Sequence, residues 1–178
     1  MNILIFGVSN VGKTIIGRML ASRIGYEFFD IDDEIKKRYG ILLEDFVNTG
    51  TLMERDRKRG EIIGMLLDSS RNRVIAVTPM SYPEYFEKYL RRKYVLVVEL
   101  VDTPENIFER LVFSDENDVI YRDDDYKIAH MSRYLKEIRE DQKRYGWCFR
   151  SVKDKFDMCN DSPEAIVDRI IAQYGLAR

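Results

Sequence analysis

The feature that most constrains the fold follows the first apolar segment of the sequence. Ile3 to Phe6 is a short run of β-favouring side chains, and the chain then reads GVSNVGKT from Gly7 to Thr14. This is the pattern G-x-x-x-x-G-K-[ST], in which two glycines let the backbone turn tightly and present its N–H groups to a phosphate chain. Ile16, Leu20 and Ile24 then recur four residues apart, as they would on the buried face of a helix. The pattern therefore predicts a phosphate-binding turn between a buried strand and a helix.

Each position of this P-loop has an expected role in binding a nucleotide. The backbone amides would surround the phosphates, Lys13 would reach the β- and γ-phosphates, and the Thr14 hydroxyl would bind Mg²⁺. The helix that follows adds the positive end of its dipole at the same place. The residues expected to contact the nucleotide phosphates are Gly7, Asn10, Val11, Gly12, Lys13, Thr14 and Ile15.

Apolar runs and helical patterns alternate along the rest of the chain. Because continuous apolar runs are typical of strands buried on both faces, this alternation predicts an α/β fold, a three-layer α/β/α sandwich with a central parallel sheet of about five strands. A chain of 178 residues fits one domain, so we expect residues 1–178 to form a single domain. After the first strand, we expect strands at 26–29, 73–77, 94–100 and 155–158 and helices at 31–39, 51–68, 82–91, 104–113, 126–145 and 163–174.

Composition limits the classes of partner. The net charge of −2 arises from many opposed charges, which gives no electrostatic case for binding nucleic acid. We find no targeting peptide and no apolar run near the ~20 residues that span a bilayer. We therefore expect a cytoplasmic protein, a monomer or weak dimer, that acts on a small molecule and binds neither nucleic acid nor membrane.

Two kinds of nucleotide-binding protein are disfavoured by missing motifs. The sequence contains neither an N-K-x-D guanine-binding motif nor a D-x-x-G switch, which argues against a signalling GTPase. The third strand ends in Thr78-Pro79, where many P-loop ATPases carry an aspartate for the metal ion. Another acidic residue must take that role.

The best candidates for it follow the second strand, in FFDIDDEIKKRYG. Asp30 and Asp32 come at the carboxyl end of that strand, which is the edge of a parallel sheet where ligands bind. Asp30 could hold Mg²⁺, and Asp32 could accept a proton from an acceptor hydroxyl. The alternative is that Asp32 and Asp33 only cap a helix, although capping and catalysis can coexist.

The combination of GVSNVGKT, FFDIDDEIKKRYG and ILLEDFVNTGTLMERDRKRGEII resembles the shikimate kinase family of small P-loop kinases, which fold like nucleoside monophosphate kinases. The resemblance implies that Asp30 lies in the metal environment and that Asp32 binds the acceptor hydroxyls. It implies that Arg55 grips the substrate carboxylate and that Arg110 lies against the adenine. It also implies that Arg122, in a lid, reaches the transferring phosphate.

The resemblance further assigns substrate binding to a helical segment at about 31–68 and a lid to about 113–126. A second substrate arginine would lie on the long helix, as Arg139 or as Arg144. The residues themselves also draw attention to the helix at 51–68, because Arg55, Asp56 and Arg59 interrupt its apolar stripe. Its first half therefore faces either a polar ligand or solvent.

The chain also departs from the family pattern. Thr78-Pro79-Met80 stands where shikimate kinases carry three glycines, and the lid has one arginine among many acids. We therefore expect a kinase that uses ATP and Mg²⁺ to phosphorylate a hydroxyl of a small, anionic metabolite in a divergent pocket. Lys13, Asp32 and Arg122 are the expected catalytic residues. The alternatives are a gluconate- or nucleotide-type kinase, or a nucleotide-binding sensor that has lost catalysis.

Overall fold

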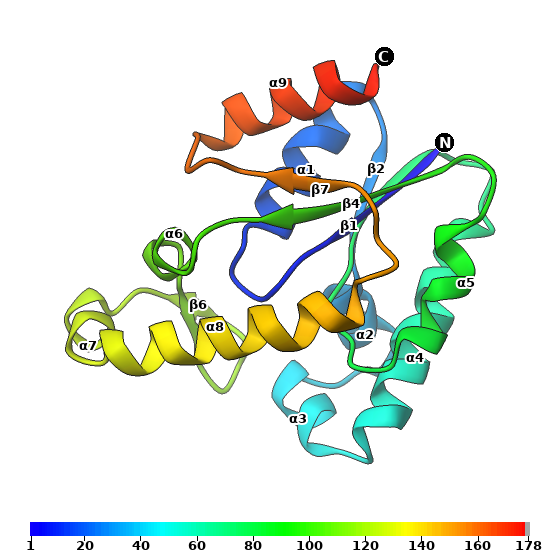
Figure 1. Ribbon diagram of the computed structural model, residues 1–178. Coiled ribbons are helices and arrows are strands. Elements are labelled where there is room, and N and C mark those ends of the chain that lie inside the picture. The colour runs from blue at the N-terminus through cyan, green and yellow to red at the C-terminus, as the bar shows by residue number, and fades with distance from the viewer. Residues whose placement is uncertain (177–178) are drawn as a thin grey trace.

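The computed structural model describes residues 1–176, whose main feature is a five-stranded parallel sheet with helices on both faces (Figure 1). The strand order is β2-β3-β1-β4-β7, which puts the strand before the P-loop in the centre. The predicted three-layer α/β fold with five parallel strands is confirmed.

The strands of this sheet are β1 (Asn2–Phe6), β2 (Glu27–Asp30), β3 (Arg73–Ala76), β4 (Val95–Val101) and β7 (Lys155–Asp157). A separate two-stranded hairpin consists of β5 (Phe113–Ser114) and β6 (Ile120–Tyr121). The helices are α1 (Lys13–Ile24), α2 (Ile31–Tyr39), α3 (Leu43–Asn48), α4 (Leu52–Leu67), α5 (Glu87–Leu90), α6 (Pro104–Glu109), α7 (Asp124–Ala129), α8 (Met131–Cys148) and α9 (Pro163–Tyr174), with a 3₁₀ turn at Pro83–Tyr85.

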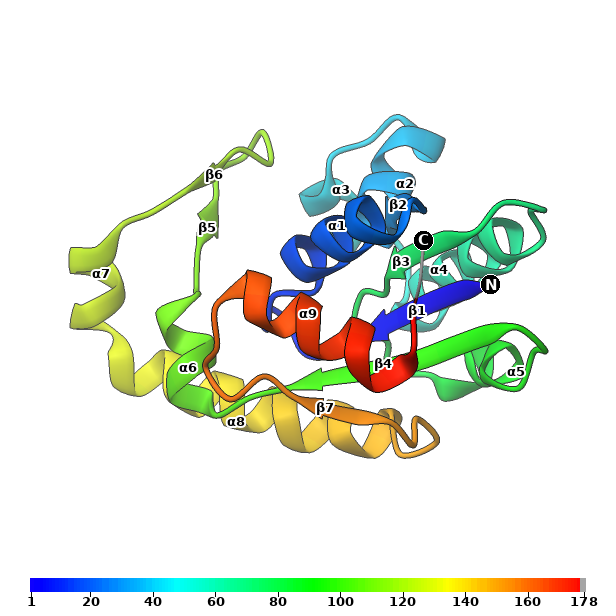
Figure 2. The ribbon, with the colours of Figure 1, turned by 90° about the horizontal axis from the view of Figure 1, so that it is seen from above.

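The core lies on both faces of the sheet. Along β1, Ile3 and Ile5 pack with side chains of α1 and α9, whereas Leu4 and Phe6 pack with side chains of α2, α4, α5 and α8. Figure 2, seen from above, shows α1 and α9 together over one face of the sheet. Because successive strand residues point to opposite faces, an uninterrupted apolar strand serves both layers.

The segment at about 113–126, where the resemblance places a lid, contains regular structure. No strand was expected there, but the structure has the hairpin β5-β6 and the start of α7. Asp115 stabilises the hairpin turn, because its carboxylate accepts hydrogen bonds from the amides of Asn117 and Val119. The expected helix at 126–145 is two helices that meet at His130.

Three other helices differ from the prediction. The segment 82–91 forms a 3₁₀ turn and the short helix α5, and the helix expected at 104–113 ends at Glu109. Helix α3 was not anticipated, and it packs through Phe46, which is buried. Within residues 1–176, none of the helices has the length and apolar character needed to cross a membrane.

Candidate active site

The P-loop has the strained backbone that its glycines permit. Gly7 and Gly12 have φ of +143° and +113°, and a Cβ atom on Gly7 would lie 2.8 Å from the carbonyl oxygen of Leu100. Asn10 also adopts positive φ, of 59°. Gly12 is the N-cap of α1 and leaves the first turn of that helix without a side-chain cap. The free amides of this turn are suited to an anion such as a phosphate.

Lys13 lies within this loop, and its Nζ donates hydrogen bonds to the carbonyl oxygens of Gly7 (3.0 Å) and Val8 (2.8 Å). Burial lowers the pKa of Lys13 to about 8, against the opposing effect of the Asp32 and Asp30 carboxylates. Its ammonium group is thus placed among backbone groups that would face a phosphate chain. Val11 is buried and Ile15 is exposed, so these two residues can contribute to phosphate binding through their amides.

The carboxylate after β2 meets the P-loop helix. Thr14 donates a hydrogen bond from Oγ1 to Oδ2 of Asp30 (2.6 Å), and Asp30 accepts a second one from the amide of Asp32 (3.0 Å). Asp30 is therefore both the N-cap of α2 and the partner of Thr14. This oxygen pair suits Mg²⁺, which takes one or two protein oxygens together with substrate phosphates. Within residues 1–176 no three acidic, histidine or cysteine side chains gather to hold a metal by themselves.

The two carboxylate oxygens of Asp32 lie in different environments. Its side chain is 30% exposed, but its Oδ1 atom is buried and makes no hydrogen bond within the described chain. The exposed part of the carboxylate is therefore on the Oδ2 side. Burial raises the pKa of Asp32 and the nearby Asp30 raises it further, while Arg59 lowers it. The Thr78 hydroxyl also faces this carboxylate, although the two have no hydrogen bond of good geometry.

Behind Asp32 lies a buried ion pair on α4, formed by two of the three charged residues that interrupt the apolar stripe of this helix. Nη1 of Arg59 lies 3.2 Å from Oδ1 of Asp56, and Nη2 lies 4.0 Å from Oδ1 of Asp32. Asp56 also accepts hydrogen bonds from the amides of Ser81 (2.7 Å) and Tyr82 (3.1 Å). The pair thus connects α4, α2 and the loop after β3.

Arg55 does not join this cluster. It donates from Nη1 to the carbonyl oxygens of Gly50 (2.9 Å) and Thr49 (3.3 Å), in the loop before α4. Asp56 and Arg59, in contrast, share the spacing of the buried residue Ile63 on the same helix. Spacings of three and four residues mark one helix face, so the sequence does put Asp56 and Arg59 on the face of a buried residue, although Arg55 has the same spacing from Arg59.

The two candidate arginines of α8 point to different neighbours. Arg139 pairs with Glu105 of α6 (2.8 Å), on the exposed surface. Arg144 donates from Nη2 to Oγ of Ser81 (2.8 Å), the residue whose amide is held by Asp56. A groove of about 830 Å³ adjoins Arg144, lined by Leu52, Ser81, Tyr82, Glu140, Lys143, Trp147 and Cys148. Only Arg144 therefore belongs with the loop after β3.

At the other side of the P-loop, Arg110 ends α6. Its guanidinium pairs with Asp102 at the end of β4, and its Nε atom is buried without a hydrogen-bond partner among residues 1–176. Asp102 is itself held by the amide of Thr103 and the side chain of Asn106. Arg110 is thus fixed in orientation close to the start of the lid.

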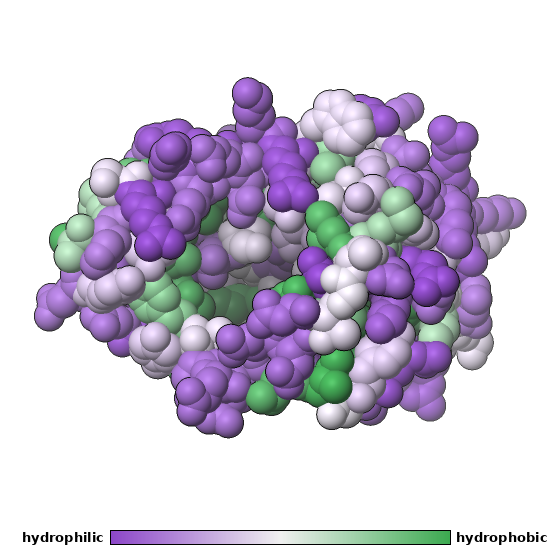
Figure 3. Space-filling model, turned by 90° about the horizontal axis from the view of Figure 1, so that it is seen from below, coloured by the Kyte–Doolittle hydropathy of each residue, from purple (hydrophilic) through white to green (hydrophobic). Residues whose placement is uncertain are grey.

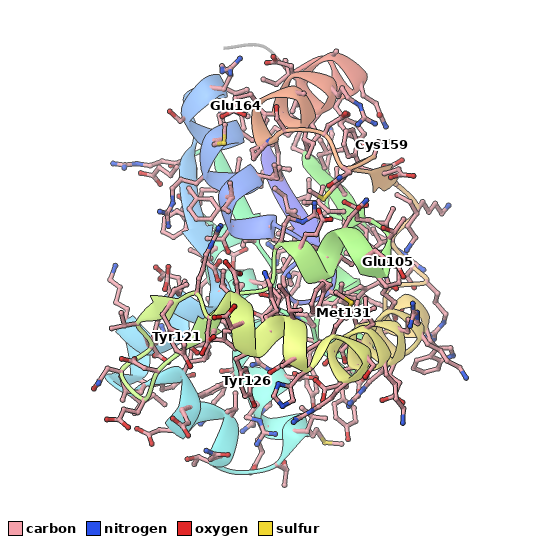
Figure 4. The ribbon with its side chains drawn as sticks, turned by 90° about the vertical axis from the view of Figure 1, so that its left-hand side faces the viewer. Glu105, Tyr121, Tyr126, Met131, Cys159 and Glu164 are labelled. Carbon is pink, nitrogen blue, oxygen red and sulfur yellow. The ribbon has the colours of Figure 1, made fainter. Side chains whose placement is uncertain are left out.

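The β5-β6 hairpin, in the segment expected to be a lid, reaches across to α3. Asp118, at the tip, accepts a hydrogen bond from the amide of Leu43 (2.9 Å), which lies in the first turn of α3. In Figure 4 the lid around Tyr121 runs between α1 and the helices α3 and α4. Arg122 is exposed beside Tyr121, with no hydrogen bond or ion pair to the P-loop among the described residues. Figure 3 shows the molecule hollowed on the lower face, with polar side chains round the rim.

Comparison with known proteins gives a consistent result. The family model described as shikimate kinase matches residues 9–174 of this chain. The chain is 28% identical over 174 residues to the shikimate kinase of Persephonella marina, covering 97% of this chain and 98% of that protein. It is 27% identical over 179 residues to the shikimate kinase of Thermodesulfovibrio yellowstonii, covering 97% and 94% of the two chains.

A solved structure has the same fold. The shikimate kinase of Acinetobacter baumannii in complex with shikimate superposes with a TM-score of 0.73 and 22% identity, covering 97% of this chain and 92% of that one. Both the sequence and the fold comparisons thus extend over nearly the whole chain.

Proposed function

The chain belongs to the shikimate kinase family of ATP-dependent small-molecule phosphotransferases, and on this premise we propose how its own residues carry out the transfer. The γ-phosphoryl group of ATP moves to a hydroxyl group of a small acceptor bound beside Asp32. The observation that supports this assignment is the convergence of Lys13, Thr14, Asp30 and Asp32 at the carboxyl ends of β1 and β2.

Positioning and charge stabilisation provide the catalysis. The amides of the P-loop and the Nζ of Lys13 hold the phosphates of ATP. Oδ2 of Asp32 accepts the proton of the acceptor hydroxyl, whose oxygen forms the new bond to phosphorus as the bond to the β-phosphate oxygen breaks. Arg122 approaches the transferring group when the lid moves, and the closed lid excludes water that would otherwise take the phosphoryl group.

Thr14 and Asp30 are the residues that would hold Mg²⁺, since their oxygens already lie 2.6 Å apart beside the P-loop. When bound, the ion supplies positive charge that offsets the negative charge of the β- and γ-phosphates. Arg110, held by Asp102, forms one side of the adenine site.

Of the three candidate arginines, Arg144 is the best placed to bind an anionic group of the acceptor. Its guanidinium donates a hydrogen bond to Ser81 in the loop after β3, whereas Arg139 and Arg55 have other partners. We further propose a divergent acceptor pocket, because Thr78 and the fully buried Met80 stand where the family pattern has glycines. Shikimate is the first acceptor to test, followed by gluconate and the nucleoside monophosphates.

The decisive experiment measures ADP release with Mg·ATP and each acceptor for the wild-type chain and for Lys13→Ala. We expect acceptor-dependent ADP release by the wild type and its loss, by about 10³-fold, in Lys13→Ala. Lys37→Ala changes an exposed lysine of α2 and is the matched control. Binding of Mg·ATP without transfer to any of these acceptors would contradict the proposal and favour a nucleotide sensor.

A further inference from the structure

The carboxylate of Asp32 can act as a general base only if a neighbouring group fixes its orientation. A carboxylate at the start of a helix can rotate about its side-chain bonds, and a general base must lie within hydrogen-bond reach of the proton it accepts. In the structure one oxygen, Oδ1, is buried and directed to the protein interior, while the other lies on the exposed side. A group on the buried side must therefore keep Oδ1 of Asp32 in its position.

Arg59 is the charged group on that side. Its side chain is only 7% exposed, and its Nη2 lies 4.0 Å from Oδ1 of Asp32. The guanidinium lies over the ring of Phe46, with its central carbon 5.2 Å from the ring centroid. Because Arg59 is enclosed between Phe46 and two carboxylates, it is badly placed to reach a substrate directly.

Asp56 fixes Arg59 in turn. The Asp56 carboxylate is fully buried and uses Oδ1 for Arg59 and Oδ2 for the amides of Ser81 and Tyr82. A planar guanidinium held at one Nη group presents its other donors in a fixed direction. The orientation of Arg59 is thus set by a carboxylate that cannot itself rotate without losing three hydrogen bonds.

The cluster contains one cation and two acidic groups. Arg59 lies between Asp56 and Asp32, so its positive charge is more than matched by two carboxylates. A buried ion pair is weak evidence for stability, because removing charges from water is costly. A buried pair directed at a functional carboxylate is better explained by orientation than by stability.

We propose that Arg59, held by Asp56, is the positioning residue of Asp32: it draws Oδ1 into the protein and so directs Oδ2 at the acceptor hydroxyl. This inference rests on the proposed phosphotransfer. Asp56 also accepts a hydrogen bond from the amide of Ser81, whose hydroxyl contacts Arg144. The same buried pair therefore fixes Asp32, on one side of the proposed acceptor pocket, relative to the loop after β3 on the other.

The test compares Arg59→Met with the wild type in steady-state kinetics and in Mg·ATP binding by calorimetry. Misplacement of the base lowers kcat by about 100-fold, with the Kd for Mg·ATP within twofold of the wild type. Arg57→Met makes the same chemical change at an exposed position of α4 and keeps the wild-type kcat. Arg59→Met with normal Mg·ATP binding and normal kcat would overturn the inference.

If Arg59→Met does not fold, as loss of Mg·ATP binding would reveal, Arg59→Lys replaces it. Lysine keeps the charge but lacks the planar fork that faces both carboxylates, so kcat falls by about tenfold with an unchanged Kd for Mg·ATP. A kcat within twofold of the wild type would then overturn the inference.

A double-mutant cycle separates positioning from general support of the fold. If Arg59 acts through Asp32, the substitution at residue 59 has little further effect on the residual turnover of Asp32→Asn, measured in long incubations. Independent effects that multiply would overturn the inference. A crystal structure of the residue 59 variant provides a second readout, in which Oδ1 of Asp32 leaves its buried position; an unmoved carboxylate overturns the inference.

These outcomes are distinguishable from failure of the proposed function. A wild-type chain that transfers phosphate to no acceptor overturns both statements. An active wild type with an equally active, folded residue 59 variant overturns only the role of Arg59.

Discussion

The P-loop end and the acceptor end of the proposed active site are built in different ways. At the P-loop end, the hydrogen bonds of Lys13 with Gly7 and of Thr14 with Asp30 join residues 6 and 16 positions apart. At the acceptor end, Ser81 lies 25 positions from Asp56 and 63 positions from Arg144. The proposed phosphate site is thus formed by one strand–turn–helix unit and its neighbour, while the proposed acceptor site depends on the packing of α4, α8 and the loop after β3. We expect changes at the first end to impair nucleotide binding and changes at the second to impair acceptor phosphorylation alone.

The largest effect is expected where the two ends meet, at Asp32. Asp32→Asn removes the group proposed to accept the hydroxyl proton, so we expect kcat to fall by about 10³-fold. The Kd for Mg·ATP stays within a few fold, as calorimetry would measure. Asp33→Asn is the control, because Asp33 is exposed and pairs only with Lys36 among the described residues. Equal kcat values for Asp32→Asn and the control would show that this carboxylate takes no part in phosphoryl transfer.

The next largest effect is expected at the P-loop end, for Gly7→Ala. The new methyl group meets the backbone of Leu100 at a positive φ, and the free energy of unfolding falls by about 3 kcal/mol. Urea denaturation measures this change, and calorimetry should show weaker Mg·ATP binding.

Gly25→Ala separates the two causes of that effect. Gly25 also has positive φ, of 74°, but no atom lies within 4 Å of an added Cβ, so the cost is about 1 kcal/mol. Equal losses at positions 7 and 25 would mean that backbone strain, and not the close approach to Leu100, determines the cost.

A smaller effect is expected at the acceptor end, for Asp56→Asn. One amide oxygen cannot replace three accepted hydrogen bonds and the charge opposite Arg59, so the free energy of unfolding falls by about 2 kcal/mol. Acceptor phosphorylation falls while Mg·ATP binding is kept. Asp45→Asn on α3 is an exposed control for the urea and kinetic measurements. Loss of Mg·ATP binding in Asp56→Asn would contradict the independence of the two ends.

The smallest effect is expected for the lid contact, in Asp118→Ala. The Leu43 amide loses its partner, which weakens lid closure by about 1 kcal/mol and raises the KM for the acceptor by up to about fivefold. Glu116→Ala removes another exposed acid from the same hairpin and should leave KM unchanged. A similar rise in KM for both variants would show that the effect comes from the negative charge of the hairpin and not from the hydrogen bond of Asp118.

The central architecture could be predicted because it depends on local patterns. Apolar runs gave the order of the strands along the chain, and the five-stranded parallel sheet is confirmed. The lid was less predictable, since the hairpin β5-β6 is stabilised by the turn at Asp115 and by the packing of Phe113 on Tyr121. Neither contact produces a recognisable hydrophobic periodicity in the sequence, because each strand of the hairpin has only two residues.

The site residues divide in the same way. The placement of Lys13, Thr14, Asp30 and Asp32 beside one another followed from a motif and from the end of the next strand. The choice among the charged residues on α4 did not follow from the sequence, because Arg55 and Arg59 lie one turn apart on nearly the same helix face. Their neighbours decide between them: Arg55 meets the loop before α4, whereas Arg59 is buried against Phe46.

By itself, the sequence determined the P-loop, the alternation of strands and helices, and the two aspartates at the edge of the sheet, since these depend on residues close together in the chain. Only the tertiary structure decided that Asp56 and Arg59 lie behind Asp32, that Arg144 and not Arg139 meets Ser81, and that Asp118 joins the lid to α3. The physical reason is that burial and pairing of charges depend on how helices pack against distant loops. A charged side chain in the sequence looks the same whether it will be solvated or enclosed.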